Sequence, residues 1–104
     1  MDALEEKKAI EIILIDIHEV ASFTDFFIIC SGTSNRMLQS LINTITDTAK
    51  DILNKKGRVM GFPENGWVAV DLGDIVIHIF SSDQRAYYNL EELWADGKTL
   101  LKIS

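Results

Sequence analysis

The stretch WVAVDLGDIVIHIF, from Trp67 to Phe80, predicts a β-hairpin and with it the class of the fold. Apolar residues flank Leu72-Gly73 on both sides, which indicates two strands and a tight turn with glycine at its second central position. This register places Trp67 opposite His78 and predicts one wholly apolar face and one mixed face. The apolar face holds Val68, Val70, Ile75, Ile77 and Ile79, and the mixed face holds Trp67, Ala69, Asp71, Asp74, Val76 and His78.

The chain before the hairpin predicts two further strands and a long helix. Residues 11–17 and 26–32 are β-branched and nearly continuously apolar, as in strands covered on both faces. Over residues 35–56 apolar positions recur every three or four residues, which predicts a one-sided helix. Ser34 is its expected N-cap and Gly57 its expected stop.

Shorter elements complete the predicted order β-β-α-β-β-β-α. RVMGF at residues 58–62 predicts a short strand, residues 83–94 predict a final helical region, and residues 2–9 predict a short charged helix. The tail after Gly97 has no clear pattern. The fold class expected is α/β (α+β): a single domain over residues 1–104, with a mixed β-sheet of about five strands, one long helix and two shorter helices.

The charge balance restricts the partners. The net charge is −6 and the ten Lys and Arg residues are scattered, whereas nucleic-acid binders need a basic surface. Direct RNA or DNA binding is therefore disfavoured, and a basic partner is favoured. The single cysteine favours a reducing compartment, the start resembles no signal or transit peptide, and no apolar run approaches the roughly 18 residues of a membrane span. We expect a cytoplasmic protein that does not enter a membrane.

Asp71, Asp74 and His78 are the residue types of a metal or acid–base site, but their spacing argues against one. His78 lies four residues beyond Asp74, about 13 Å along a strand, so no single metal ion could bind both. Aspartates beside a tight turn are usual turn chemistry, and the histidine fits a half-buried position. Trp67 is the better functional candidate, because an exposed tryptophan anchors interfaces, although a core role is equally open.

Two more stretches carry candidate residues. CSGTSNR, from Cys30 to Arg36, is a strand-to-helix turn without the lysine of a phosphate-binding Walker loop. Cys30 lies in an apolar strand and is expected to be a buried, inert thiol, while Arg36 is either a partner contact or simply solvated. In RAYYNLEELW, Tyr87 and Tyr88 cannot share one helix face, so one should pack inward and the other face a partner beside Arg85.

Four motifs in this order resemble the Iojap-like family, the ribosomal silencing factors: ILIDI, TDFFIICSGTSNR, WVAVDLGDIVIHIF and RAYYNLEELWAD. The resemblance runs from about residue 12 to residue 96 and implies a nucleotidyltransferase-like fold without catalytic apparatus, cofactor or metal. It also implies binding to the large ribosomal subunit through a basic ribosomal protein, number fourteen. The resemblance further implies that such binding blocks joining of the small subunit and represses translation when nutrients are scarce.

The resemblance assigns the partner surface to Trp67, and we extend it to Val68, Ala69, Asp71 and His78. The remaining family motifs map onto Ser31, Gly32, Ser34, Arg36, Asp74, Arg85, Tyr88 and Leu90. Met37 stands where the family usually has histidine.

Three alternatives stay open at this point. One is a degenerate nucleotidyltransferase-like enzyme or hydrolase that uses Asp71, Asp74 and His78. Another is an RNA-binding module. Self-association into a homodimer is the third, because one long helix leaves apolar sheet surface to be covered.

Overall fold

The structure is a computed structural model that describes residue 4 and residues 9–103 of the 104-residue chain. The elements in chain order are β1 (Ile10–Asp16), β2 (Phe26–Gly32), α2 (Asn35–Leu53), β3 (Arg58–Phe62), the short 3₁₀ helix η1 (Pro63–Asn65), β4 (Trp67–Asp71), β5 (Ile75–Ser81), α3 (Ser82–Tyr88), α4 (Leu90–Leu93) and β6 (Lys98–Ile103). The short helix predicted over residues 2–9 falls largely outside the described residues.

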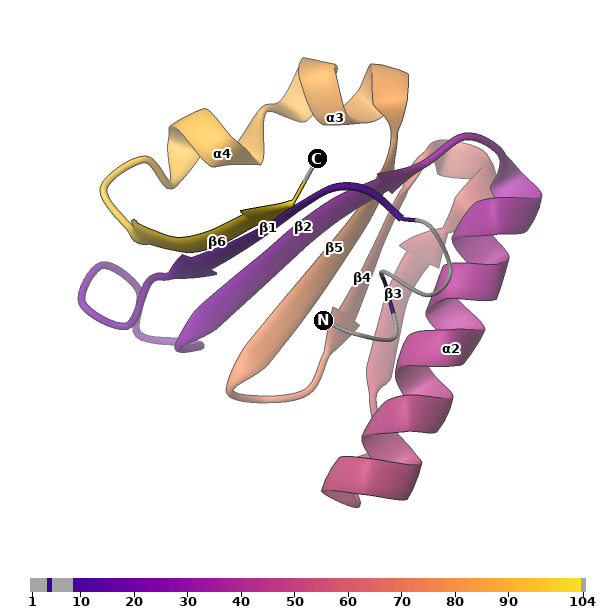
Figure 1. The fold of residues 1–104 in the computed structure, drawn as a ribbon, viewed down its shortest axis with the longest axis horizontal. Coiled ribbons are helices and arrows are strands. Elements are labelled where there is room, and N and C mark those ends of the chain that lie inside the picture. Colours follow the sequence, from indigo (N-terminus) through magenta and orange to yellow (C-terminus); the bar gives the residue numbers. More distant parts are fainter. Residues whose placement is uncertain (1–3, 5–8, 104) are drawn as a thin grey trace.

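The strands form one mixed sheet in the order β3-β4-β5-β2-β1-β6 (Figure 1). β2 and β5 are parallel, and every other neighbouring pair is antiparallel. The predicted mixed sheet is confirmed, but it has six strands where about five were expected. The sixth is the unplaced tail, which pairs with β1 and forms an edge of the sheet.

The β4–β5 hairpin forms as predicted, but its register differs by two residues. The backbone N–H of Leu72 donates to the carbonyl of Ile75, so Gly73 and Asp74 are the central turn residues. Gly73 has a φ of 94° and takes the first central position, as in a type II′ turn. Trp67 therefore lies opposite Phe80, not His78. A shift of two residues preserves the faces, so the predicted distribution of side chains between the faces is otherwise retained.

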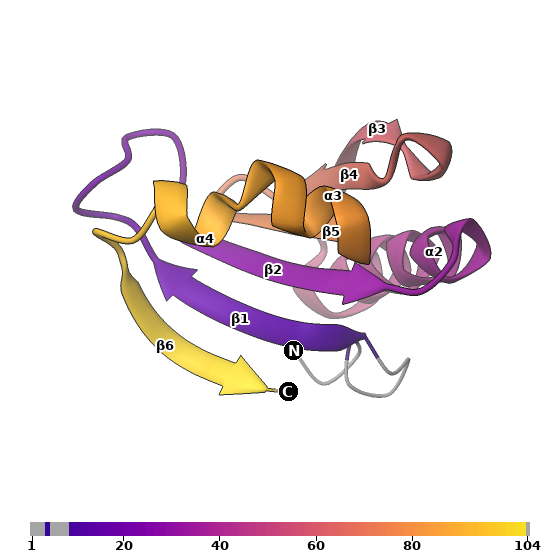
Figure 2. The ribbon, with the colours of Figure 1, turned by 90° about the horizontal axis from the view of Figure 1, so that it is seen from above.

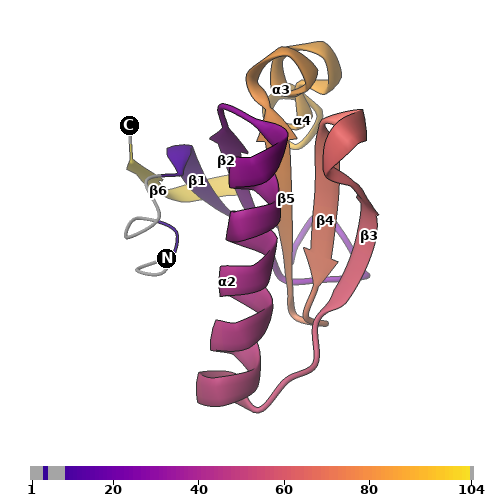
Figure 3. The ribbon, with the colours of Figure 1, turned by 90° about the vertical axis from the view of Figure 1, so that its right-hand side faces the viewer.

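Each face of the sheet carries its own hydrophobic cluster. On one face α2 packs its apolar side, with Leu38 and Leu41 fully buried, against Val68, Val70, Ile77 and Ile79 (Figure 3). On the other face the cluster joins β1, β2, β4 and β5 to α4: Ile13, Ile15, Ile17, Phe27, Ile29, Ala69, Val76, Phe80 and Leu90. The chain of α3 and α4 runs across one end of the strands, as the view from above shows (Figure 2).

The helix ends differ in part from the expected ones. Ser34 caps α2 as predicted, because its Oγ accepts a hydrogen bond from the backbone N–H of Met37 at 3.1 Å. The helix ends at Leu53, with Asn54 in the left-handed region, so Gly57 is not its stop. The final helix is broken at Asn89, which is also left-handed and divides the expected segment into α3 and α4. In the described residues no helix is long and apolar enough to cross a membrane.

Candidate functional site

An apolar groove lies on the sheet face opposite α2, with a volume of about 280 Å³. Its floor is formed by β4 and β5, and its walls by β3 on one side and by α4 and the β1–β2 loop on the other. Ten side chains line it: Phe23, Phe27, Met60, Trp67, Ala69, Asp71, Val76, His78, Leu90 and Trp94. Four of the five expected partner-binding residues are among them, which makes this groove the candidate site.

The fifth expected residue, Val68, faces the opposite way. Side chains alternate along a strand, so Val68 points toward α2 while Trp67 and Ala69 face the groove. Val68 is fully buried in the cluster beneath α2. Its side chain is therefore not available to a partner in this structure, and we leave Val68 out of the proposed surface.

Trp67 is held by three neighbouring rings. Its indole Nε1 donates a hydrogen bond to Nδ1 of His78 at 3.2 Å. The indole stacks on Phe80, with ring centroids 5.1 Å apart and planes inclined by 24°, and Tyr88 packs against it at 4.6 Å. Trp67 is half-buried: one part of its indole packs in the core and another part stays exposed. Both roles that the sequence left open, core residue and surface residue, therefore apply in part.

His78 is buried on the groove floor, and this burial lowers the pKa of its imidazole to about 4. A neutral imidazole that accepts at Nδ1 carries its proton on Nε2. Within the described part of the chain, that Nε2 has no hydrogen-bond partner. The ring of Phe27 lies edge-on to the imidazole, with centroids 4.6 Å apart. His78 therefore serves as a neutral acceptor for Trp67.

The two aspartates of the hairpin accept hydrogen bonds from different partners. Oδ1 of Asp71 accepts the backbone N–H of Gly73 at 2.8 Å, which is the turn chemistry that the sequence predicts. Oδ1 of Asp74 accepts from Nζ of Lys55 at 2.8 Å, and this hydrogen bond lowers the pKa of Asp74. In residue 4 and residues 9–103, no group of three or more His, Cys, Asp or Glu side chains is arranged to hold a metal ion.

Arg85, one of the family-motif residues, is a buried link between elements. It is only 6% exposed. Its Nη1 donates to the Ser31 hydroxyl at 3.0 Å and to the Ile10 carbonyl at 3.3 Å, and its Nε donates to Glu91 at 2.9 Å. One guanidinium thus fixes α3 and α4 to β1 and β2, and thereby places Tyr88 against Trp67.

The other motif residues have structural positions around the start of α2 and in α4. A Cβ on Gly32 would lie 2.9 Å from Leu38, so the turn before α2 packs too closely for a larger residue. Arg36 is exposed in the first turn of α2, and Leu90 is buried against the sheet. Cys30 is fully buried, as expected, and burial raises the pKa of its thiol to about 12.

Several residues in and beside the groove were missed by the sequence reasoning. Phe80 would have been found with the correct hairpin register, since it lies opposite Trp67. Met60 lies opposite Ala69 and enters the groove from the edge strand β3. Phe23 and Trp94 come from segments far apart in the chain, with ring centroids 5.9 Å apart, and no local pattern predicts that they meet.

Comparisons with known proteins agree with this arrangement of motifs. The sequence profile described as "Ribosomal silencing factor during starvation" matches residues 1–103. The chain belongs to the ribosomal silencing factor family. A family member from Bacillus subtilis, ribosomal silencing factor RsfS, is 40% identical over 95 residues, which cover 91% of this chain and 80% of the relative.

Two further relatives extend the comparison. A mouse protein named "Mitochondrial assembly of ribosomal large subunit protein 1" is 31% identical, over 88% of this chain and 41% of its own length. A crystal structure of a Chromobacterium violaceum protein superposes with a TM-score of 0.85 at 33% identity, over 90% of this chain and 78% of the other. The resemblance and the mixed fold are thus confirmed, while the relation to nucleotidyltransferases stays a prediction.

Proposed function

We propose that this ribosomal silencing factor binds the large ribosomal subunit through a basic ribosomal protein, number fourteen, and prevents the small subunit from joining. The observation that carries the proposal is Trp67, half-buried at an apolar groove and held in one orientation by His78, Phe80 and Tyr88. Tryptophans fixed in this way are typical interface anchors, because little side-chain entropy is lost on binding.

The charge of the chain supports a basic partner. The net charge is −6, and a basic protein surface on the subunit would steer association with a complementary acidic one. The name of the mouse relative refers to the large ribosomal subunit, which supports the same choice of subunit.

The proposed action is steric and non-enzymatic, and it takes place in the cytoplasm. A protein that occupies the joining face of the large subunit lowers the yield of joined ribosomes and thereby represses translation under nutrient limitation. The groove supports this role through its apolar lining, with Asp71 the one carboxylate among the lining residues. We assign the contact to Trp67, Ala69, Asp71 and His78.

Co-sedimentation tests the proposal. The purified protein should pellet with large subunits and not with small ones, should lower the yield of joined ribosomes, and should cross-link to ribosomal protein fourteen. Failure to pellet with large subunits would remove the proposal.

Trp67→Ala tests the assigned surface. We expect it to weaken binding by about 30-fold, as for an interface hot spot of about 2 kcal/mol. Ile52→Ala is the matched control, because Ile52 is a strongly exposed apolar residue on α2, away from the groove. A folded Trp67→Ala protein that binds like the control would show that the partner surface lies elsewhere.

A further inference from the structure

Four aromatic side chains form an exposed row beside the groove: Phe62, Trp67, Tyr88 and Tyr87, called here the aromatic row. Phe62 lies directly opposite Trp67 in the β3–β4 pair, so both emerge on the same face. Tyr88 packs on Trp67 at 4.6 Å, and Tyr87 stands edge-on to Tyr88 at 5.1 Å. Phe62 is 62% exposed, Tyr88 45% and Tyr87 78%. Large aromatic surface left in water at adjoining positions indicates an interaction site.

The elements that flank the row are acidic. Their carboxylates are Glu64 in η1, Asp83 in α3, and Glu91 and Glu92 in α4. The one cation on these elements is Arg85, which is buried and paired with Glu91 at 2.9 Å.

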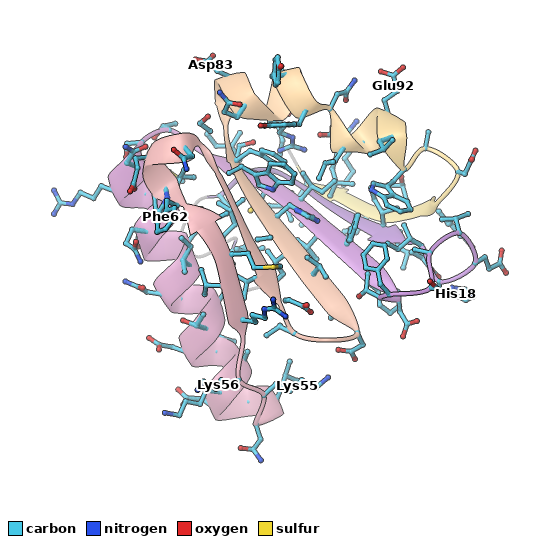
Figure 4. The ribbon with its side chains drawn as sticks, turned by 180° about the vertical axis from the view of Figure 1, so that it is seen from behind. His18, Lys55, Lys56, Phe62, Asp83 and Glu92 are labelled. Carbon is cyan, nitrogen blue, oxygen red and sulfur yellow. The ribbon has the colours of Figure 1, made fainter. Side chains whose placement is uncertain are left out.

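Arg58 and the two lysines that follow α2 lie away from the row. Arg58 is opposite Asp71, at the far end of β3 from Phe62. Figure 4 shows Phe62, Asp83 and Glu92 near the end of the molecule that carries α3 and α4, and Lys55 and Lys56 at the opposite end. The elements that flank the aromatic row, η1, α3 and α4, therefore carry a net negative charge.

Aromatic faces and carboxylates together select a cation. The face of an aromatic ring is negative and attracts ammonium or guanidinium groups, and a planar guanidinium also stacks on it. A purely apolar partner would gain nothing from the carboxylates, and the phosphates of a nucleic acid would be repelled by them. A second copy of this chain, with its net charge of −6, would bring the same sign of charge.

From this combination we propose that the aromatic row receives an arginine-bearing basic segment of the protein partner, with guanidinium groups stacked on Tyr87 and Tyr88. The inference rests on the proposed function and adds the chemistry of the contact beyond the groove. Trp67 then has two neighbours in the complex, an apolar contact on its groove side and a cation on its outer side.

Substitutions at Tyr87 separate aromatic from merely apolar contact. Tyr87→Leu keeps apolar surface and removes the ring, whereas Tyr87→Phe keeps the ring. We expect Tyr87→Leu to weaken binding to large subunits by about two- to fivefold, the usual size of an exposed cation–π contact, and Tyr87→Phe to bind nearly as wild type. Phe62→Leu should add to the loss in the double variant. Equal binding by wild type and Tyr87→Leu, with Ile52→Ala as control, would overturn the inference and leave the proposed function standing.

A probe experiment on the isolated protein does not depend on ribosomes. In ¹H–¹⁵N spectra, hexa-arginine should shift the resonances of Tyr87, Tyr88 and the Trp67 indole, and hexa-glutamate and a uridine dodecamer should not. The inference is overturned if the uridine dodecamer shifts the resonances of the row, or if hexa-arginine shifts only resonances elsewhere. It is also overturned if wild type is a dimer and Tyr87→Leu is a monomer, because the row would then be a contact between two copies of this chain. If wild-type protein fails to pellet with large subunits, the proposed function falls, and the peptide result still decides whether the row binds arginine.

Discussion

The indole N–H of Trp67 points at Nδ1 of His78, 3.2 Å away, and the buried imidazole can only accept it. Both residues face the groove from neighbouring strands, with His78 opposite Ala69 and diagonal to Trp67. Together with the rings of Phe80 and Tyr88, this hydrogen bond gives the half-buried Trp67 one orientation before any partner binds. This preorganisation lowers the entropy that binding costs.

The hydrogen bond predicts a signature in the ¹H–¹⁵N spectrum. His78→Phe keeps a ring on the groove floor and removes the acceptor, so the Trp67 indole proton should move upfield and exchange faster with D₂O. The Trp94 indole serves as the internal reference within the same protein. An unchanged Trp67 indole resonance in His78→Phe would show that the bond is not formed in solution.

The pKa of His78 predicts a loss of stability in mild acid. Burial lowers this pKa from 6.5 to about 4, so between these values the unfolded chain binds the proton and the folded chain does not. The free energy of unfolding should therefore fall as the pH drops through this window, by about 2 kcal/mol between pH 7 and pH 5.

Urea unfolding of wild type and His78→Gln across this pH range isolates the effect. His18 acts in the opposite direction, because its hydrogen bond to Asp16 raises its pKa and favours the folded state at low pH. That contribution is common to both proteins and cancels in their difference. Parallel pH curves for the two proteins would contradict the assigned role of His78.

Arg85 should be among the most sensitive polar positions. Arg85→Ala removes the hydrogen bonds to Ser31, Ile10 and Glu91 together, which should lower the free energy of unfolding by about 3 kcal/mol. Arg85→Lys should restore only part of this, because an ammonium group lacks the planar fork. Chemical denaturation measures both. The exposed Arg36 offers a control, and Arg36→Ala should change stability by less than about 0.5 kcal/mol.

Two glycines form a matched pair that tests the packing around Trp67. Gly61 and Gly73 both have positive φ, of 91° and 94°. A Cβ on Gly61 would lie 2.5 Å from the carbonyl oxygen of Trp67, whereas a Cβ on Gly73 would have no described atom within 4 Å. Gly73→Ala should therefore cost about 1 kcal/mol of backbone strain alone. Gly61→Ala should cost about 3 kcal/mol and also weaken subunit binding, since Trp67 must move. Equal losses in thermal unfolding would contradict this reading of the edge strand.

The hairpin shows how far the sequence could predict the site. Alternation assigned Trp67, Ala69 and His78 to one face correctly, because the faces survive an error of two residues. The turn itself was misplaced because Leu72-Gly73 and Gly73-Asp74 are both reasonable central pairs by composition. The contact between Trp67 and His78 was thus expected as a direct cross-strand pair and is found as a diagonal one.

Other features depend on tertiary contacts that no local pattern reports. The segment KTLLKI lacks the strict alternation that would predict a strand. It forms β6 because its backbone pairs with that of β1. The left-handed residue Asn89 breaks the final helix within a sequence that otherwise reads as continuous. The burial of Arg85 could not be predicted locally, because the Ser31 hydroxyl to which it donates lies far away in the sequence.

The pairing of β6 with β1 also bears on how the chain folds as it is made. Ile12 lies opposite Ile103 in this ladder, so the contact joins residues from nearly the two ends of the described chain. Such non-local contacts form late, because the entropy cost of closing a long loop comes before the contacts can offset it. Synthesis runs from the amino end, and β1 keeps one open edge until β6 has emerged from the ribosome. β1, the first of the six described strands in chain order, is therefore among the last to be fully paired.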